Sequence, residues 1–118
     1  MKNKRKLGKE YEAAVKKTLE QEGYRILKEN YRCPLGEIDL IARDGKVLVF
    51  VEVKYRSSRQ CGLPEEAVTA KKQRRISRTA RWYLMEQGYA EEVLCRFDVA
   101  AVSKDSVRIY QNAFDCRR

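Results

Sequence analysis

Two apolar segments joined by Asp44-Gly45 constrain the fold more than any other part of this sequence. Residues 36–41 and 47–54 are rich in Val, Ile, Leu and Phe, the composition of buried β-strands. Asp-Gly supplies the positive φ angles that a two-residue primed turn needs, so the two segments are predicted to form an antiparallel hairpin. A sheet built around this hairpin is the expected centre of the fold.

The hairpin places charged side chains in apolar surroundings. With Asp44-Gly45 as a two-residue loop, the register puts Glu37 directly opposite Glu52. Because side chains alternate along a strand, Asp39 and Lys54 are expected on this same face. Asp39 and Glu52 then become diagonal neighbours, with Cβ atoms about 7–8 Å apart.

Charged groups inside a sheet persist only where they neutralise one another, bind a metal ion or face water, because burying each one alone costs several kcal/mol. Asp39 and Glu52 suit a hard cation such as Mg²⁺ or Mn²⁺, which binds one or two carboxylates together with water and phosphate oxygens. Lys54 is then placed to orient a water or to stabilise charge on a phosphoryl group. Spacing alone leaves a buried salt bridge of Lys54 with either carboxylate equally open.

The excess of positive charge predicts a polyanionic partner. The 118 residues carry 26 Lys and Arg against 17 Asp and Glu, a formal net charge of +9 without any histidine. No segment has the length of a membrane span, and no apolar region follows the basic residues 1–6, as a secretory signal would require. Nucleic acid, and no membrane, is therefore the expected partner.

The cysteines are expected to be thiols in a reducing cytoplasm. They stand at wide intervals, without a Cys-x-x-Cys pair and without histidine, so structural zinc is not predicted. The four are Cys33, Cys61, Cys95 and Cys116.

The other segments surround the hairpin with helices and strands. Helices are predicted over about residues 8–22 and 65–87, a loop over 55–64, and further strands over 24–32, 93–102 and 107–110. The order α-β-β-β-α-β-β predicts an α/β fold, a mixed central sheet of about five strands flanked by helices. The length suits a single domain, residues 1–118.

The second predicted helix has an apolar side and a cationic side. The apolar side carries Thr69, Gln73, Ile76, Ala80, Tyr83 and Leu84. The cationic side suits phosphate backbones, which it would hold without reading the base sequence. A solvated helix face is the alternative, which the nearly uniform sign of the charges disfavours. The candidate phosphate contacts are Lys71, Lys72, Arg74, Arg75, Arg78 and Arg81, with Arg56 and Arg59 on the preceding loop.

The order of the charged groups resembles a known nuclease arrangement. Glu12 on the first helix, Glu37-Ile38-Asp39 and Glu52-Val53-Lys54 resemble the PD-(D/E)XK restriction-endonuclease-like superfamily, in its Holliday-junction-resolvase-like branch. Longer matches resemble the YraN-like family of bacterial proteins, classed as endonucleases by similarity. These matches lie at residues 37–45, 51–54, 67–69, 72–75, 96–99 and 113–114.

The resemblance implies a restriction-endonuclease-like fold, with Asp39 and Glu52 as metal ligands and Lys54 as the catalytic lysine. Glu12 would be an accessory acid supplied by the first helix, and Glu37 would support the ligands from the same face. The alternative for Glu12 is a first-turn glutamate that is favourable to the helix dipole.

Two further polar residues on predicted buried faces are candidates for internal contacts. Gln73 would contact the site, as a glutamine often does in the superfamily, or it would instead cap a backbone group. Asp98 lies between Phe97 and Val99 in a predicted strand, and it is expected to be an internal salt-bridge partner.

The sequence therefore favours a Mg²⁺- or Mn²⁺-dependent nuclease that cuts structured or branched DNA. The alternative is a nucleic-acid-binding module with the same fold that does not cleave, and a third hypothesis is a scaffold that binds an acidic protein surface. Junction resolvases of this fold act as dimers, so the resemblance also implies a homodimer.

Overall fold

The computed structural model describes residues 4–55, 68–104 and 106–115, with side chains from residue 8 onward. The elements are α1 (Lys4–Gln21), β1 (Arg25–Cys33), β2 (Gly36–Asp44), β3 (Val47–Tyr55), α2 (Ala70–Glu86), β4 (Cys95–Val102) and β5 (Val107–Phe114). This order confirms the predicted α-β-β-β-α-β-β arrangement. Tyr55 ends β3, and the rest of the predicted loop lies outside the described residues together with Glu65, the predicted start of the second helix.

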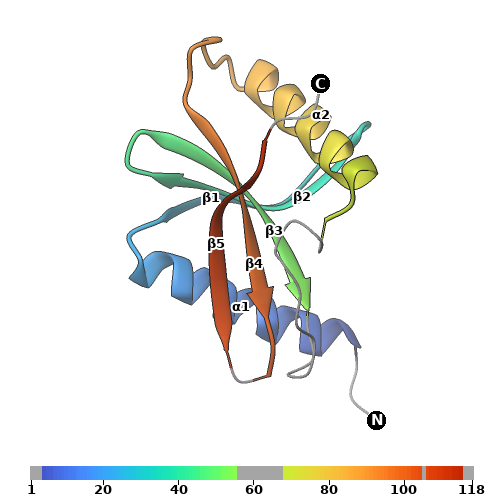
Figure 1. Ribbon diagram of the computed structural model, residues 1–118, viewed down its shortest axis with the longest axis vertical. Helices are drawn as coiled ribbons and strands as arrows, with labels where there is room; N and C mark the ends of the chain where they lie inside the picture. Colours follow the sequence, from blue (N-terminus) through green and yellow to red (C-terminus); the bar gives the residue numbers. More distant parts are fainter. Residues whose placement is uncertain (1–3, 56–67, 105, 116–118) are drawn as a thin grey trace.

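All five strands form one mixed sheet in the order β1-β2-β3-β4-β5 (Figure 1). β3 and β4 run parallel, whereas the other neighbouring pairs are antiparallel. Because a parallel pair needs a long crossover connection, α2 follows β3 and precedes β4 in the chain.

The two helices cover opposite faces of the sheet (Figure 1). On the α1 face, Val15 and Leu19 pack into a core cluster with side chains of β2, β3 and β4. On the α2 face, Ile76, Ala80 and Tyr83 pack into a second cluster. β3 is buried on both sides, which explains why its sequence is an almost continuous apolar run.

The β2–β3 turn lies one residue later than predicted. Asp44 pairs with Val47, so the loop is Gly45-Lys46, and the predicted register with Glu37 opposite Glu52 is wrong by two residues. Gly45 has a φ of 62° and supplies the positive angle at the first loop position, where a primed turn favours glycine. Because the error is an even number of residues, the side chains of the paired residues keep their predicted faces.

Two helix and strand ends also differ from the prediction. Thr69 is not an apolar-face residue of α2 but its N-cap, and its side chain accepts a hydrogen bond from the Lys72 backbone N–H at 3.2 Å. β5 continues to Phe114, beyond the predicted end at Tyr110, through a bulge where Asn112 has a φ of 52°. The bulge interrupts the regular alternation by which strands are recognised.

Among the described residues, neither helix is long and apolar enough to cross a membrane. Cys33 is a thiol, and Cys61 and Cys116 lie outside the described residues.

Candidate functional site

β2 bends away from β3 at Asp39. The hydrogen-bonded pairing of these strands ends with Leu40 opposite Val51. Ile38 and Ile41 pack into the same core cluster, although a regular strand would direct residues three apart to opposite faces. The bend leaves the end of β3 open on the side of β2.

Asp39 and Glu52 are the next residues beyond that last pair, so they lie across from each other. Oδ2 of Asp39 accepts a hydrogen bond from the Val53 backbone N–H at 2.7 Å, where β2 no longer continues the ladder. Burial, followed by the charge of Glu52, raises the pKa of Asp39 to about 7, against the opposing effects of the Val53 hydrogen bond and of Lys72. Two carboxylates this close favour a proton or a cation between them.

Lys72 supplies a cation from α2. Its Nζ lies 2.6 Å from Oε1 of Glu52, whose side chain is only 7% exposed. Burial acts to lower the pKa of Lys72, but the hydrogen bond and charge of Glu52 outweigh it, so the pKa is raised. The sequence predicted Lys72 only as a phosphate contact, because no pattern in it reveals which strand residue the first turn of α2 reaches.

Lys54 lies beside this pair without joining it. Burial and the neighbouring charge of Lys72 lower the pKa of Lys54, and the charges of Glu52 and Asp39 only partly oppose this. Among the described residues, no ion pair joins Lys54 to either carboxylate. A salt bridge to the buried Glu52 therefore exists at this site, but Lys72 forms it and not Lys54, the lysine that the alternative to a metal site had named.

These groups line one open pocket of about 890 Å³ between the sheet and α2. Glu37 is at its exposed rim, where Oε2 lies 3.1 Å from Nε of Arg32. The pocket is lined by Arg32, Cys33, Gly36, Glu37, Asp39, Glu52, Val53, Lys54, Tyr55, Lys72, Arg75 and Ile76.

Arg32 is a pocket residue that the sequence analysis missed. It pairs with Glu37 across the β1–β2 ladder, and a two-residue turn at Pro34-Leu35 sets the register of this ladder. Proline followed closely by glycine is a turn signal, so this pair was open to prediction.

Glu12 acts on the pocket through Tyr55. Burial raises the pKa of Tyr55, and the charges of Glu12 and then of Asp39 add to the effect. The Tyr11 ring packs against Tyr55 with 5.3 Å between centroids. Tyr55 lines the pocket, so the charges of Glu12 on α1 and of Asp39 both act on a residue of the pocket wall.

A glycine allows α2 to lie close over the start of β2. A Cβ atom added to Gly36 would stand 3.0 Å from Cγ of Arg75 and 3.0 Å from Oγ1 of Thr79. The missing side chain therefore lets the first half of α2 approach the sheet, which is where Lys72 meets Glu52.

Residues 11–102 match the uncharacterised protein family UPF0102. The chain belongs to this family. A UPF0102 protein of Lachnoclostridium phytofermentans is 53% identical over 109 residues, covering 92% of this chain and 91% of its relative. One of Symbiobacterium thermophilum is 50% identical over 115 residues, covering 93% and 97%. These matches confirm the YraN-like family resemblance of the sequence.

A solved structure gives a weaker likeness. The structure of Pyrococcus furiosus SfsA in complex with Ca²⁺ shares 19% identity with this UPF0102 chain, at a TM-score of 0.34. The alignment covers 92% of this chain and 62% of SfsA. A structural similarity this weak supports no conclusion about the site.

Asp39 and Glu52 fit a hard divalent cation in this UPF0102 site. Within the described part of the chain, no group of three or more His, Cys, Asp and Glu side chains is gathered for a metal. Magnesium sites need only one or two carboxylates when water and phosphate oxygens complete the shell. Burial, followed by repulsion from Glu52, raises the pKa of Asp39, and a bound cation would relieve that repulsion.

Gln73 and the outward face of α2 complete the predicted set. Gln73 is buried, and its Nε2 donates to the Val68 carbonyl oxygen at 2.8 Å. Of the two roles predicted for Gln73, this contact is the capping of a backbone group. Arg75 lines the pocket, while Arg56 and Arg59 lie outside the described residues. The remaining predicted cations are exposed on α2: Lys71, Arg74, Arg78 and Arg81.

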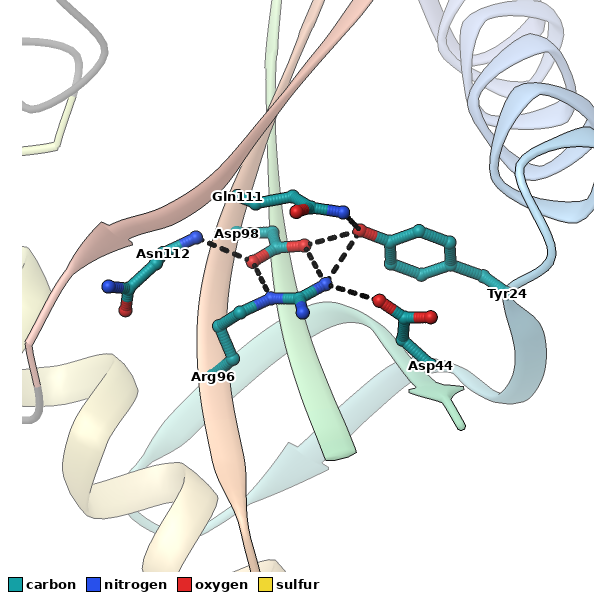
Figure 2. A network of polar contacts seen from close by, with 6 residues as sticks. All are labelled: Tyr24, Asp44, Arg96, Asp98, Gln111 and Asn112. Atoms are coloured by element: carbon teal, nitrogen blue, oxygen red, sulfur yellow. Dashed lines mark hydrogen bonds and ion pairs between the residues drawn. The ribbon is translucent and has the colours of Figure 1, made fainter. Parts of the chain in front are cut away.

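Asp98 belongs to a separate polar network, shown in Figure 2. The salt bridge predicted for it is confirmed, because Nε of Arg96 lies 2.8 Å from its Oδ1. Tyr24 donates to Oδ2 at 2.9 Å, and the Asn112 backbone N–H donates to Oδ1 at 2.9 Å, which closes the β5 bulge. None of these described residues lines the pocket, so this network stabilises the fold.

Proposed function

We propose that this protein is a metal-dependent nuclease that acts in the cytoplasm on structured or branched DNA. The observation that carries the proposal is Asp39, hydrogen-bonded to the Val53 backbone N–H beside the buried Glu52, in an open pocket that also holds Lys54. Such a pocket combines two ligands for a hard cation with a cation for phosphoryl charge. The order of these groups resembles that of PD-(D/E)XK enzymes, which supports the same reaction.

In this proposal the carboxylates of Asp39 and Glu52 hold Mg²⁺ or Mn²⁺. When bound, the ion supplies Lewis acidity and a water of lowered pKa. The Lys54 amine contacts the phosphoryl oxygens and stabilises the charge that grows on them. Arg75 at the pocket wall holds a neighbouring phosphate and so fixes the position of the nucleic-acid strand relative to the pocket.

A specific observation favours a second function, that of a nucleic-acid-binding module without cleavage. Lys72 neutralises Glu52 at 2.6 Å, so the site has a charge partner that requires no metal. A protein of this kind would bind nucleic acid through its basic face, with strong salt dependence and no need for a divalent ion.

Cleavage assays with matched variants distinguish the two functions. Plasmid, single-stranded and four-way-junction DNA are incubated with Mg²⁺ or Mn²⁺ and the wild type, Asp39→Asn, Lys54→Ala or the control Glu92→Gln. Glu92 is exposed and precedes β4, at the end of the sheet away from the pocket. The nuclease proposal expects cleavage by the wild type and control only, abolished by EDTA.

Equal cleavage by all four proteins would identify a contaminating nuclease and overturn the assignment. Salt-sensitive binding with no cleavage under any metal would favour the binding module. Sedimentation of the same preparations, with and without DNA, tests the homodimer that the resolvase resemblance implies.

A further inference from the structure

The only tryptophan of the chain lies on the outward face of α2. Trp82 is 39% exposed, and Met85 three residues later is 81% exposed. Exposed apolar side chains are common singly, but these two stand among the arginines of a strongly cationic helix face. The face therefore combines positive charge with an aromatic ring.

One stripe of this face leads from the pocket to Trp82. Lys71, Arg75, Arg78 and Trp82 follow one another at intervals of four, three and four residues, which places them on one side of the helix. Arg75 lines the pocket. Trp82 is ten residues beyond Lys72, the residue that contacts Glu52, so its Cα atom lies about 15 Å further along the helix axis.

Charge selects the kind of molecule that fits this stripe. A second copy of the same face would bring five cations against five, because Lys71, Arg74, Arg75, Arg78 and Arg81 are all exposed. A nucleic-acid strand carries phosphates for the arginines and flat apolar bases for the ring. Arginines interleaved with an aromatic side chain form the kind of surface that binds single strands.

We propose that Trp82 stacks on an unpaired base of a strand whose backbone follows Arg78 and Arg75 into the pocket. The inference rests on the proposed function only for the end of the strand that enters the pocket. Within a duplex both faces of each base are covered by its neighbours, so a base inside the strand can meet the ring only when it is unpaired. The stacked base and the phosphate at Asp39 and Glu52 then belong to different nucleotides of the same strand.

The substrate class is therefore nucleic acid with a single-stranded stretch next to the cleaved bond, such as an overhang, a flap or an open branch. Blunt duplex DNA satisfies the arginines but leaves Trp82 unused.

Trp82 also provides its own probe, because no other residue of the chain contributes tryptophan fluorescence. The full chain is titrated in EDTA with a single-stranded oligonucleotide, a blunt duplex of the same sequence, and heparin, which has charge but no bases. We expect quenching by the oligonucleotide and little change with the duplex or heparin. Equal quenching by all three would overturn the proposal.

Affinity for a labelled oligonucleotide, measured by anisotropy, gives a second readout. Trp82→Ala is expected to weaken binding roughly 5- to 150-fold, and Trp82→Phe much less, because base stacking on an aromatic ring contributes about 1–3 kcal/mol. The control Leu94→Ala removes an exposed apolar side chain that precedes β4, and its affinity is expected to match the wild type. Unchanged affinity in Trp82→Ala would overturn the proposal.

The outcome separates this inference from the proposed function. Base-dependent quenching without cleavage after adding Mn²⁺ would support stacking and overturn the nuclease. Cleavage of blunt duplex as fast as of an overhang substrate would support the nuclease and overturn the role of Trp82.

Discussion

Nζ of Lys72 lies 2.6 Å from Oε1 of Glu52, an ion pair that joins the first turn of α2 to the end of β3. Glu52 is almost fully buried, whereas the Lys72 side chain is 41% exposed. The lysine therefore neutralises a charge that the sheet could not hold alone, and it approaches from the side where solvent and substrate enter.

Lys72→Met should lower the free energy of unfolding by about 1–3 kcal/mol, because it leaves Glu52 buried without its ion-pair partner. The cost stays below that of a fully buried pair, since the pocket is open and Lys54 is close by. Urea unfolding measures the change. The control Lys71→Met alters an exposed neighbour, and an equal loss in both variants would assign the effect to the helix rather than to Glu52.

A divalent ion and Lys72 should compete for Glu52. We expect Mn²⁺ to bind Lys72→Met more tightly than the wild type, and to raise its melting temperature by a larger amount. Calorimetric titration of the apoprotein gives the affinities without any cleavage. Equal affinity of Mn²⁺ for both proteins would show that Lys72 and the ion do not compete for Glu52.

The contribution of Asp39 to the stability of the wild type should fall as the pH rises from about 4 to 7. The ordinary pKa of Asp39 is 3.8 and the folded value is about 7, so the folded state holds this proton more tightly than the unfolded chain. The contribution of Asp39 to the free energy of unfolding is therefore greatest below pH 3.8. It decreases with rising pH until Asp39 is ionised in both states, and the whole decrease is at most about 4 kcal/mol.

Asp39→Asn removes that titration, so the difference in unfolding free energy between variant and wild type should grow from pH 4 to pH 8. The comparison cancels the titration of all other groups. Glu92→Gln, with its exposed side chain, should show no such trend. A constant difference for Asp39→Asn would show that burial and Glu52 do not raise this pKa.

Gly36→Val should destabilise the protein by about 1–3 kcal/mol, because its side chain would meet Thr79 and Arg75 where α2 crosses β2, and because a φ of 152° strains a β-branched residue. Gly8→Ala is the matched change, since an added Cβ lies 3.9 Å from the Tyr55 hydroxyl, an ordinary contact. Alanine favours a helix over glycine, so this second variant should be slightly more stable. Thermal unfolding of both tests whether position 36 requires glycine while position 8 does not.

The order and faces of the elements could be predicted because they depend on local patterns. Apolar alternation and the Gly45 turn signal gave the hairpin, and the two-sided composition of α2 gave its buried and exposed sides. The turn position was wrong by one residue because Asp-Gly and Gly-Lys loops both satisfy the local rule. Because the resulting register error is an even number of residues, the predicted face of Asp39 is still correct, and so is its predicted place beside Glu52.

Contacts between distant segments could not be predicted. The ion pair of Lys72 with Glu52 depends on how closely α2 lies on the sheet, and residue spacing does not contain that distance. Tyr24 reaches Asp98 from 74 residues away, so no local signal marks it as a partner. The pattern could show that Asp98 is buried, and burial of a carboxylate predicts only that some partner exists.

Asp98→Asn should cost about 2–4 kcal/mol of stability while leaving Mn²⁺ affinity unchanged. Oδ1 faces Nε of Arg96 and the Asn112 N–H, and Oδ2 faces Nη2 of Arg96 and the Tyr24 hydroxyl (Figure 2).

Whichever way an amide is turned at Asp98, its NH₂ group therefore meets an Arg96 donor, so one side of the network must open. Asp44→Asn is the control, because that carboxylate is 35% exposed and only its Oδ2 contacts Arg96, which lets the amide oxygen keep the contact. We expect a loss below about 1 kcal/mol for this control. A Mn²⁺ affinity that falls in Asp98→Asn but not in Asp44→Asn would show that the network, although outside the pocket, holds the β3 end of the site in place.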